Sequence, residues 1–268
     1  MRRALLTGAN GVFGVHIAEG LLQQGIETHC VVRDSEKAAG LRAILESRGV
    51  NVALLATHIC DLNSASSIAS LAAQFSSSRP LNILINNAAA TSGTRSETVE
   101  GLELQWSTNV LAYQRLTRAV LPHLLASDAS SNGRARVVFV ASNYAGGLNL
   151  SDPEFKARTY CGDAAYRASK QANRMLCKAW SERCGGVLFF SCHPGVATSN
   201  VSLGLGFDLD RSVLAAQAGA KTPLFLALAP TTALTNGGFY SGSKLKACSF
   251  CASEEENKEL WAIVERYN

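Results

Sequence analysis

Short apolar runs alternate with longer amphipathic stretches along almost the whole of this 268-residue chain. Apolar runs of strand length occupy residues 3–6, 28–32, 52–57, 82–85, 136–141, 187–192 and 238–240. Stretches with helical periodicity occupy residues 14–24, 36–47, 65–76, 99–126, 163–184, 212–229 and 253–266. Repeated strand–helix alternation is typical of a parallel sheet that is covered by helices on both faces. We therefore expect an α/β fold built on a single doubly wound parallel sheet of about seven strands, flanked by helices.

The composition favours one domain with a large core. Hydrophobic residues make up 47% of the chain and charged residues 17%, and no linker rich in Pro, Gly or Ser divides it. We therefore expect a single domain over residues 1–268. The formal charge of +4 comes from scattered basic residues, which does not favour a nucleic-acid partner. No apolar run reaches the ~18 residues that span a bilayer, so we expect a protein without a transmembrane segment, in the cytoplasm or another reducing intracellular compartment.

The eight cysteines do not form the even framework of a disulfide-stapled protein. Several lie in apolar stretches, where buried free thiols are common, and this usage favours a reducing compartment. Cys248-Ser-Phe-Cys251 is a single C-x-x-C pair with no second pair and no histidine nearby. An ordinary pair of thiols is therefore favoured over a zinc or redox role, and we expect no metal.

A glycine-rich turn follows the first expected strand and leads directly into a helix. Its sequence is Thr7-Gly8-Ala9-Asn10-Gly11-Val12-Phe13-Gly14. Glycines in such a turn let the backbone approach a pyrophosphate closely, and the helix N-terminus offers free N–H groups. Three glycines alone are weak evidence, but their place at the start of an alternating pattern predicts dinucleotide binding. The alternative is a plain tight turn.

The end of the second expected strand indicates which cofactor the chain prefers. In nucleotide-binding folds of this kind an acidic residue there holds the ribose 2′-hydroxyl, but here Val32 is followed by Arg33. An arginine can pair bidentately with a 2′-phosphate. Asp34 comes next, and we expect it to cap the following helix. We therefore predict NADP(H), with NAD(H) less favoured, and expect that Arg3 and Lys37 could add positive charge.

Polar residues also follow the third and fourth expected strands. Asp61, in Cys60-Asp61-Leu62, could accept a hydrogen bond from the adenine amine, and the alternative is that it caps the next helix. Asn86-Asn87-Ala88-Ala89 follows the fourth strand. Ligands of open α/β sheets bind outside the carboxyl ends of the strands, so we expect both segments to lie at the cofactor site.

Tyr166 and Lys170 are four residues apart in a stretch that we expect to be helical, so their side chains share one face. An ordinary tyrosine titrates near ~10, too high for a general base at neutral pH. An ammonium beside a phenol favours the phenolate, and we therefore expect Lys170 to lower the pKa of Tyr166. The same spacing also occurs by chance in exposed helices, so its meaning depends on the rest of the chain.

Taken together, these pieces resemble the short-chain dehydrogenase/reductase family over nearly the whole chain. The matching pieces, in order, are the turn at residues 7–14, Asp61, Asn86-Asn87-Ala88, Asn109, Ser142, Tyr166-x-x-x-Lys170 and Pro194-Gly195. The chain looks most similar to the retinol-dehydrogenase-like and carbonyl-reductase-like members of the classical type. The resemblance implies a Rossmann-type sheet that binds NAD(P).

The resemblance also implies a role for each site residue. Tyr166 would be the catalytic acid/base, Ser142 would hold the substrate carbonyl, and Lys170 would contact the nicotinamide ribose. Asn109 would link Lys170 to solvent through a water. The residues implied to contact the cofactor are Gly8, Asn10, Gly11, Phe13, Gly14, Arg33, Asp61, Leu62, Asn87, Ala88, Ala89, Tyr166, Lys170, Pro194, Gly195, Val196 and Thr198.

The chain departs from the family pattern in the phosphate turn. The usual classical turn is Thr-Gly-x-x-x-Gly-x-Gly, but here Val12 stands at the middle glycine position and Gly11 comes one residue earlier. That spacing is typical of the extended branch of the family, whereas Pro194-Gly195, the asparagine pair and the short length are classical. Ala89 and Ala141 replace a glycine and a serine without removing a reacting group.

Two segments are expected near the substrate. Ser142 and Tyr166 are 24 positions apart, and we expect residues 148–161 to border the substrate pocket or to cover a helix that other members use for dimer contact. Residues 198–210 mix apolar residues with glycines, so we expect a mobile cover, with an ordinary surface connection as the alternative. The side chains that suggest a lipophilic substrate are those of Leu203, Leu205, Phe207 and Leu209.

We therefore predict an oxidoreductase, monomeric or homodimeric, that interconverts a ketone or aldehyde and an alcohol by hydride transfer with NADP(H). A non-catalytic NADP(H)-binding sensor or scaffold on the same fold is the alternative. Loss of Ser142, Tyr166 or Lys170 would favour that alternative, and all three are present. A third hypothesis, an epimerase or sugar-nucleotide enzyme of the extended branch, depends on Gly11 alone.

Overall fold

The computed structural model describes residues 1–127, 134–207 and 212–267, and its centre is one eight-stranded sheet. The strands are β1 (Arg3–Thr7), β2 (Glu27–Val32), β3 (Leu55–Ile59), β4 (Ile83–Asn86), β5 (Arg136–Val140), β6 (Leu188–His193), β7 (Phe239–Ser241) and β8 (Lys244–Lys246). Their order is β3-β2-β1-β4-β5-β6-β7-β8, with β8 antiparallel to β7 and the other neighbouring pairs parallel. The predicted doubly wound parallel sheet is confirmed.

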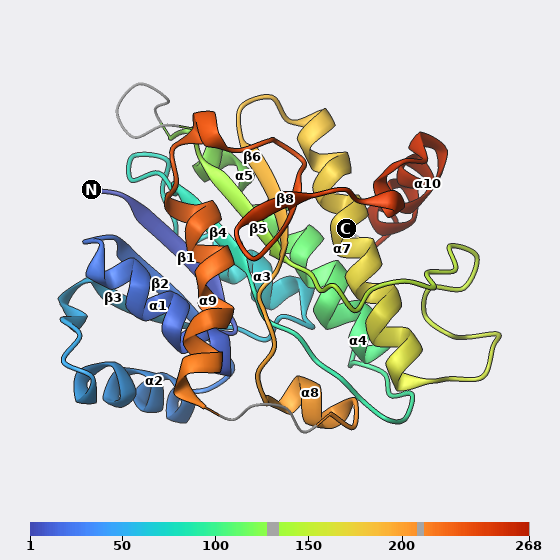
Figure 1. Ribbon diagram of the computed structural model, residues 1–268, viewed down its shortest axis with the longest axis horizontal. Helices are drawn as coiled ribbons and strands as arrows, with labels where there is room; N and C mark the ends of the chain where they lie inside the picture. The colour runs from blue at the N-terminus through green and yellow to red at the C-terminus, as the bar shows by residue number, and fades with distance from the viewer. Residues whose placement is uncertain (128–133, 208–211, 268) are drawn as a thin grey trace.

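Helices cover both faces of the sheet (Figure 1). One face packs against α1 (Val12–Gln23), α2 (Ser35–Ser47) and α9 (Val213–Leu228). The other face packs against α3 (Ala65–Ala72), α5 (Ala112–Leu125) and α7 (Gly162–Arg183), with α10 (Glu254–Glu265) lying on α7. Successive strand residues enter opposite cores, since Leu5 belongs to the α5/α7 side and Leu6 to the α1/α9 side.

Short elements complete the described chain. They are the short helices α4 (Leu104–Trp106) and α8 (Asn200–Gly204), a π-helical turn at Ser107–Leu111, and 3₁₀ turns at Val52–Leu54, Thr231–Ala233 and Ser249–Cys251. Figure 1 places α8 at the edge of the molecule where the first turns of α2 and α9 also lie. This edge is the one that the carboxyl ends of the parallel strands face.

The structure differs from the expected elements in several places, of which α8 and the end of α3 at Ala72, four residues before the expected end, are two. Three more are as follows. The expected strand 52–57 begins as a 3₁₀ turn, and β3 extends two residues further, to Ile59. The expected helix 99–126 begins only at Leu104, because the Glu103 carboxylate accepts hydrogen bonds from the backbone N–H groups of the next turn and ends the preceding loop. The third difference is β8, whose three residues, Lys-Leu-Lys, are too few and too polar to indicate a strand.

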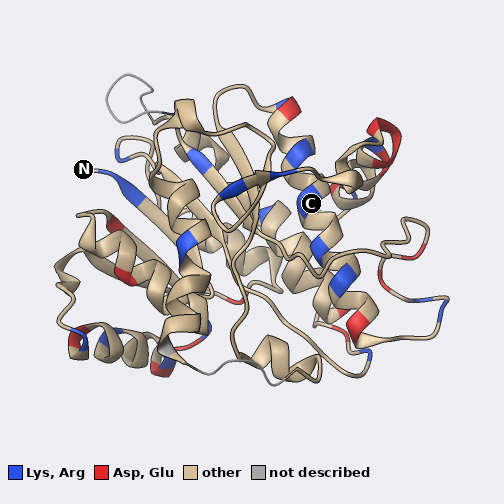
Figure 2. Cartoon of the chain, viewed as in Figure 1, with Lys and Arg blue, Asp and Glu red and all other residues tan. Residues whose placement is uncertain are grey.

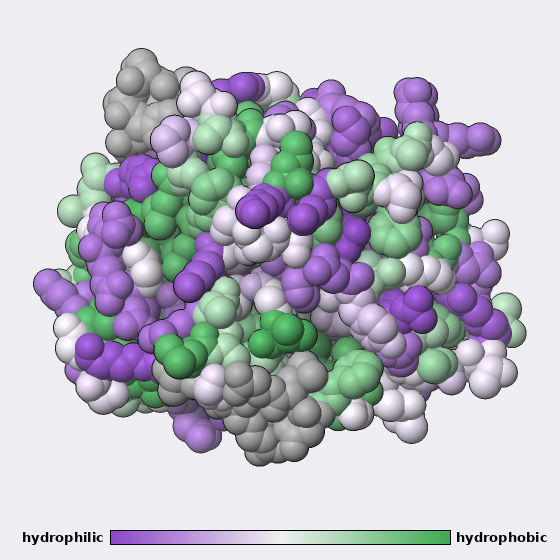
Figure 3. Space-filling view, in the orientation of Figure 1, coloured by the Kyte–Doolittle hydropathy of each residue, from purple (hydrophilic) through white to green (hydrophobic). Residues whose placement is uncertain are grey.

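The surface carries charges of both signs, interspersed over the face shown in Figure 2. Apolar side chains lie at the lower edge of the same face, where Figure 1 places α8 and the beginning of α9 (Figure 3). Exposed large apolar residues of this region include Leu203, Phe207 and Leu214. Within the described ranges, no helix combines the length and the apolarity needed to cross a bilayer.

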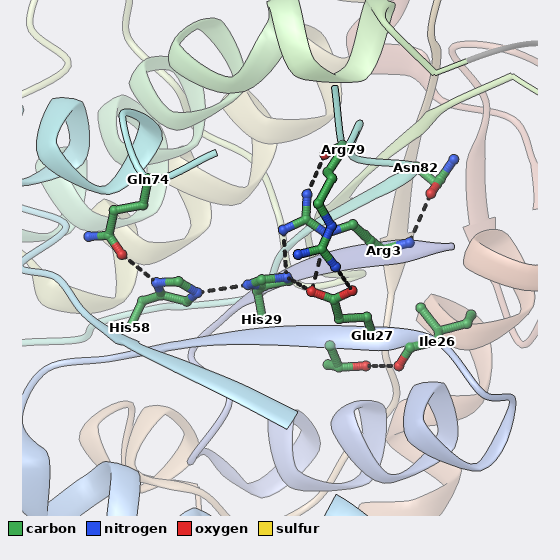
Figure 4. Close-up of polar contacts among 9 residues, drawn as sticks. Arg3, Ile26, Glu27, His29, His58, Gln74, Arg79 and Asn82 are labelled. Atoms are coloured by element: carbon green, nitrogen blue, oxygen red, sulfur yellow. Dashed lines mark hydrogen bonds and ion pairs between the residues drawn. The ribbon is translucent and has the colours of Figure 1, made fainter. Parts of the chain in front are cut away.

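A polar network lies at the amino ends of β1 and β2, at the opposite end of β1 from the glycine-rich turn (Figure 4). The Glu27 carboxylate accepts from Arg3 Nε at 3.3 Å and from Arg79 at 2.6 Å. His29 Nε2 lies 3.0 Å from the Arg3 guanidinium, and His29 Nδ1 lies 2.8 Å from His58 Nε2. Because Arg3 is held in this network, the expectation that it adds charge at the cofactor site is wrong.

His29 is kept neutral by its surroundings in this network. Burial, followed by the nearby Arg3 charge, lowers the pKa of His29 to about 4, whereas an ordinary histidine has a pKa of ~6.5. Between these two values the unfolded chain binds a proton that the folded chain does not. The free energy of unfolding therefore falls as the pH falls from about 6.5 toward 4.

We expect His29→Gln to flatten this pH dependence, because glutamine has no proton to bind but keeps a hydrogen-bonding side chain. Between about pH 7 and pH 5, the wild type should lose about 1–2 kcal/mol more of its free energy of unfolding than the variant. Urea unfolding at the two pH values measures the difference. Equal losses in the two proteins would contradict the assignment of this pH dependence to His29.

Candidate active site

A cavity of about 1080 Å³ opens along the carboxyl ends of the parallel strands. It lies beside the point where the strand order reverses, between β1 and β4, which is where open α/β sheets bind ligands. Every residue that the sequence implied as a cofactor contact lines this cavity, and so does Ser142. Asn109 is absent from the lining residues. The topology therefore brings residues from six separate strand ends to one site.

The glycine-rich turn at the end of β1 follows a tight backbone path that side chains would obstruct. Gly8 has a φ of +63°, and a Cβ on Gly14 would meet the carbonyl oxygen of Gly8 at 2.1 Å. Gly11 closes the turn by donating to Gly8 O at 3.1 Å and is the N-cap of α1. The unusual Gly11/Val12 pair therefore still presents a tight turn and a free helix N-terminus to the cavity, which fits a dinucleotide.

Thr7 and Asn87 join this turn to the end of β4. The Thr7 hydroxyl accepts hydrogen bonds from the backbone N–H groups of Asn87 and Ala88, at 2.9 and 3.0 Å. The Asn87 side-chain amide donates to Thr7 O at 3.0 Å and to Gly8 O at 3.1 Å. Asn87 therefore fixes the position of the phosphate turn relative to the adjacent strand.

The ends of β2 and β3 present a cation and a carboxylate to the cavity. Arg33 lines the cavity, whereas Asp34 accepts from the backbone N–H of Lys37 at 2.8 Å and caps α2, as the sequence predicted. Asp61 also lines the cavity, and its carboxylate accepts from a backbone N–H two residues on, at 2.9 Å. Ser64, not Asp61, is the N-cap of α3, so the alternative role for Asp61 as the cap of that helix is wrong.

Tyr166, Lys170 and Ser142 meet at the other end of the cavity. Tyr166 and Lys170 lie on α7, and the Lys170 ammonium nitrogen is 5.6 Å from the centre of the Tyr166 ring. Lys170 donates to Val140 O, at the end of β5, at 3.0 Å. Ser142 follows two residues later, and its hydroxyl accepts from the backbone N–H of Tyr144 at 3.0 Å and lies close enough to Tyr166 to favour the ionised form of that phenol. All three side chains are buried, yet they border the cavity.

Comparison with known proteins identifies the family. A sequence profile for short chain dehydrogenases matches residues 2–203. Dehydrogenase/reductase SDR family member 12 from Bos taurus is 33% identical, over 98% of this chain and 85% of its own length. Retinol dehydrogenase 13 from Homo sapiens is 31% identical, over 99% of this chain and 84% of its own length. This chain belongs to the short-chain dehydrogenase/reductase family.

Solved structures share the fold of this short-chain dehydrogenase/reductase. An uncharacterised protein from Mycobacterium paratuberculosis is 26% identical, with a TM-score of 0.80 over 99% of this chain and 92% of its own. The NADPH-bound carbonyl reductase from chicken fatty liver is 22% identical, with a TM-score of 0.67 over 92% of this chain and 99% of its own. Family membership makes this chain an oxidoreductase that acts on alcohols or carbonyls with a nicotinamide cofactor.

Burial controls the protonation of Tyr166 and Lys170 in this dehydrogenase. Burial raises the pKa of Tyr166 to about 12, and the hydrogen bond with Ser142 only partly opposes it. Burial also lowers the pKa of Lys170 to about 7. The expectation that Lys170 lowers the pKa of Tyr166 is therefore wrong for this structure. Tyr166 is a phenol at neutral pH, and is suited to donate a proton.

Asn109 lies behind the cavity wall, in the π-helical turn at Ser107–Leu111. Its side-chain oxygen accepts from Ala90 N at 2.8 Å, and its side-chain nitrogen donates to Ala90 O and to Ser169 Oγ, both at 3.0 Å. The side chain therefore holds the segment after β4 against α7. A water link from Asn109 to Lys170 stays a prediction.

The expected cover over the cavity contains a short helix. Ser199 begins α8 with a capping box, in which its hydroxyl accepts from the backbone N–H of Ser202. Leu203, Leu205 and Phe207 line the cavity as expected, whereas Leu209 lies outside the described residues. Across the cavity mouth, the ring of Phe207 packs edge-on against Tyr144, with centroids 5.7 Å apart.

The inserted residues 148–161 do not border the pocket. All of them are described, and none lines the cavity. The Tyr160 hydroxyl instead donates to Glu103 at 3.0 Å, while the Glu154 carboxylate accepts from Glu103 N at 3.0 Å and from the Tyr267 hydroxyl at 2.7 Å. The expectation of a pocket border is therefore wrong, because buried hydrogen bonds hold the insert against the start of α4 and the C-terminal end of the chain.

His193 is a site residue that the sequence analysis did not assign. It lines the cavity at the end of β6, and its Nδ1 accepts from the backbone N–H of Asn143 at 3.2 Å. Burial, followed by the nearby Arg174 charge, lowers the pKa of His193 to about 4, so the ring is neutral and can accept. It thus holds the segment that follows Ser142. Its position directly before Pro194-Gly195 is the signal that could have indicated it.

We expect Lys170→Met to stabilise the fold while it removes the amine from the site. Lys170 is 2% exposed and burial disfavours the charge of its amine. In the variant the Tyr113 hydroxyl, which donates to Ala88 O at 2.9 Å, still lies 3.4 Å from Val140 O. The free energy of unfolding at about pH 7 should rise by about 0.5–2 kcal/mol.

The matched control is Lys178→Met on the same helix, where the amine is partly exposed and pairs with Glu182 at 3.1 Å. Its effect should stay within about 0.5 kcal/mol. Urea unfolding of the three proteins measures both effects. If Lys170→Met were less stable than wild type, the hydrogen bond of Lys170 would stabilise the fold by more free energy than the burial of its charge costs.

Proposed function

We propose that this chain is an NADP(H)-dependent oxidoreductase that interconverts a lipophilic ketone or aldehyde and the corresponding alcohol. The observation that carries the proposal is the buried phenol of Tyr166 beside Ser142, at the end of a cavity that suits a dinucleotide. A phenol with a pKa of about 12 keeps its proton at neutral pH and can give it to an oxygen on which negative charge develops. The arrangement favours carbonyl reduction near neutral pH.

Ser142, Tyr166 and Lys170 each have a separate role in the proposed reaction. The hydroxyl groups of Ser142 and Tyr166 hydrogen-bond the carbonyl oxygen, and Tyr166 donates its proton as the alcohol forms. The nicotinamide cofactor supplies the hydride when it is bound. Lys170, with a pKa of about 7, exchanges a proton readily near neutral pH and replaces the one that Tyr166 has given.

The preference for NADP(H) is supported by the groups at the end of β2. Arg33 lines the cavity, where a guanidinium can pair with a 2′-phosphate. The carboxylate of its neighbour Asp34 is engaged in capping α2, so it is not directed at a ribose 2′-hydroxyl. The partly exposed Lys37 lies in the first turn of the same helix.

A lipophilic substrate is supported by the cavity mouth. The apolar and aromatic side chains there are those of Tyr144, Val196, Leu203, Leu205 and Phe207. Among the similar proteins, retinol dehydrogenase 13 is named for a lipophilic alcohol. We therefore propose a retinoid, a steroid or a fatty aldehyde as the substrate class.

We expect Tyr166→Phe to lower kcat/KM for carbonyl reduction by about 10²–10⁴-fold, because the variant has no proton to donate. NADPH binding, followed by fluorescence titration, should change little. Tyr144→Phe is the matched control, since it removes a hydroxyl from another aromatic residue that lines the cavity. Near-normal turnover in Tyr166→Phe would sink the proposed role. A wild type that binds NADPH but oxidises none with a panel of carbonyls would support the sensor alternative.

We expect Arg33→Gln to weaken NADPH binding by about 10- to 100-fold, because a hydrogen-bonded charge pair with the phosphate is lost. Binding of NADH should be almost unaffected. Arg42→Gln, on the exposed side of α2, should change neither affinity. Titration of the wild type with both cofactors is the direct test, and tighter binding of NADH would overturn the preference for NADP(H).

A further inference from the structure

The C-x-x-C pair near the C-terminus lies against the helix that carries Tyr166 and Lys170. Cys248 is the N-cap of the 3₁₀ turn at Ser249–Cys251, Cys251 is its last residue, and the turn packs on α7. Cys251 Sγ lies 3.2 Å from Cys248 Sγ and 3.5 Å from Arg174 O. Both cysteines are half-buried. A small side-chain rotation would bring the two sulfurs within bonding distance.

Arg174 connects this pair of thiols to the active site. It lies on α7 one turn after Lys170, and its guanidinium donates to Ser142 O. The guanidinium is stacked 3.5 Å from the centre of the Phe239 ring and carries its charge beside Cys248. Arg174 therefore contacts both the thiol pair and the segment that holds Ser142.

We propose that Cys248 and Cys251 are a redox-active dithiol that closes to an intramolecular disulfide, and that Arg174 couples the state of this dithiol to Ser142. Cys248 is the attacking thiol and Cys251 the resolving thiol. A metal-binding role gains no support, because no group of three or more His, Cys, Asp or Glu side chains suited to a metal occurs in the described part of the chain.

The surroundings of Cys248 favour its thiolate. The hydrogen bond from Cys251, and then the charge of Arg174, lower the pKa of Cys248 to about 6. The facing thiolate raises the pKa of Cys251, which therefore keeps its proton. Once Cys248 has reacted, its negative charge is gone, and Cys251 can lose its proton more easily.

The oxidant is a low-molecular-weight disulfide such as glutathione disulfide. The Cys248 thiolate attacks one of its sulfurs, which forms a mixed disulfide and releases one thiolate. Cys251 then attacks Cys248 Sγ, which closes the protein disulfide, and its proton passes to the second departing thiolate. Two protein thiols are thereby oxidised by two electrons, and the oxidant is reduced to two thiols.

The other six cysteines differ from this pair in burial, so their reactions can be told apart from those of Cys248 and Cys251. Five are buried, namely Cys30, Cys60, Cys177, Cys184 and Cys192. Burial raises the pKa of Cys30, Cys177 and Cys192, which makes them poor nucleophiles. Cys161 is exposed and sits at the start of α7, so Cys161→Ser is the control for a simple accessible thiol.

The first experiment follows the disulfide itself. Full-length protein is equilibrated in glutathione buffers of decreasing reducing power, acid-quenched, alkylated and mapped by mass spectrometry. We expect a reversible link between Cys248 and Cys251 in wild type and in Cys161→Ser. Cys251→Ser should stop at the mixed disulfide on Cys248. A stable glutathione adduct on wild-type Cys248, or reaction confined to Cys161, would overturn the proposal.

The second experiment tests the role of Arg174. Iodoacetamide should alkylate Cys248 about tenfold faster than the thiol of free glutathione at about pH 5.5, where an ordinary thiol is almost fully protonated. Arg174→Gln should move the midpoint of the Cys248 pH profile upward, and Arg174→Lys should restore part of the shift. A midpoint that is the same in all three proteins would show that Arg174 does not activate Cys248.

The third experiment tests the coupling to Ser142 and rests on the proposed carbonyl reduction. Closing the disulfide removes the thiolate that faces Arg174, so the contact between Arg174 and Ser142 O changes. We expect kcat to fall severalfold on oxidation and to recover with dithiothreitol, while NADPH affinity stays constant. Cys248→Ser should not respond. A disulfide that forms with no change in kcat would overturn the coupling, whereas inactivity of the reduced enzyme would instead count against the proposed function.

Discussion

The hydroxyl of Thr7 is the contact on which the site depends most. It accepts hydrogen bonds from two consecutive backbone N–H groups, those of Asn87 and Ala88, at the point where the strand order reverses. The phosphate turn and the segment after β4 are therefore fixed relative to each other. Further hydrogen bonds hold the same segment, since the Tyr113 hydroxyl donates to Ala88 O, and Asn109 accepts from the backbone N–H of Ala90 two residues later. These hydrogen bonds join the two walls of the cavity.

Burial has opposite consequences for the two titratable groups of the site. It disfavours a charged form in both, so it raises the pKa of Tyr166 and lowers that of Lys170. The tyrosine then keeps a proton to give, and the lysine can exchange one near neutral pH. The spacing of Tyr166 and Lys170 in the sequence predicts a lowered pKa for the tyrosine. That prediction includes the charge of the lysine but not the cost of desolvating the phenolate.

Topology explains why so much of the site could be predicted from the sequence. Once strand–helix alternation indicates a parallel sheet, any residue directly after a strand must lie at the same edge, and this places Arg33, Asp61, Asn87 and Pro194 together. The parts that could not be predicted depend on distant contacts. The late start of α4 depends on Glu103, whose backbone N–H donates to Glu154 in the insert. The hydrophobic periodicity of residues 99–126 does not indicate this contact, because Glu154 lies outside that segment.

One face of α7 connects the active site to the C-x-x-C pair, which lies far from it in the sequence. Tyr166, Lys170 and Arg174 follow one another at four-residue spacing, so their side chains lie in a row. The first two border the cavity, and the third reaches both Ser142 O and the thiols of the C-x-x-C pair. The spacing of two cysteines alone indicated an ordinary thiol pair. The fold places this pair beside Arg174, a buried cation that also donates to Ser142 O, and this contact is what supports the proposed redox role.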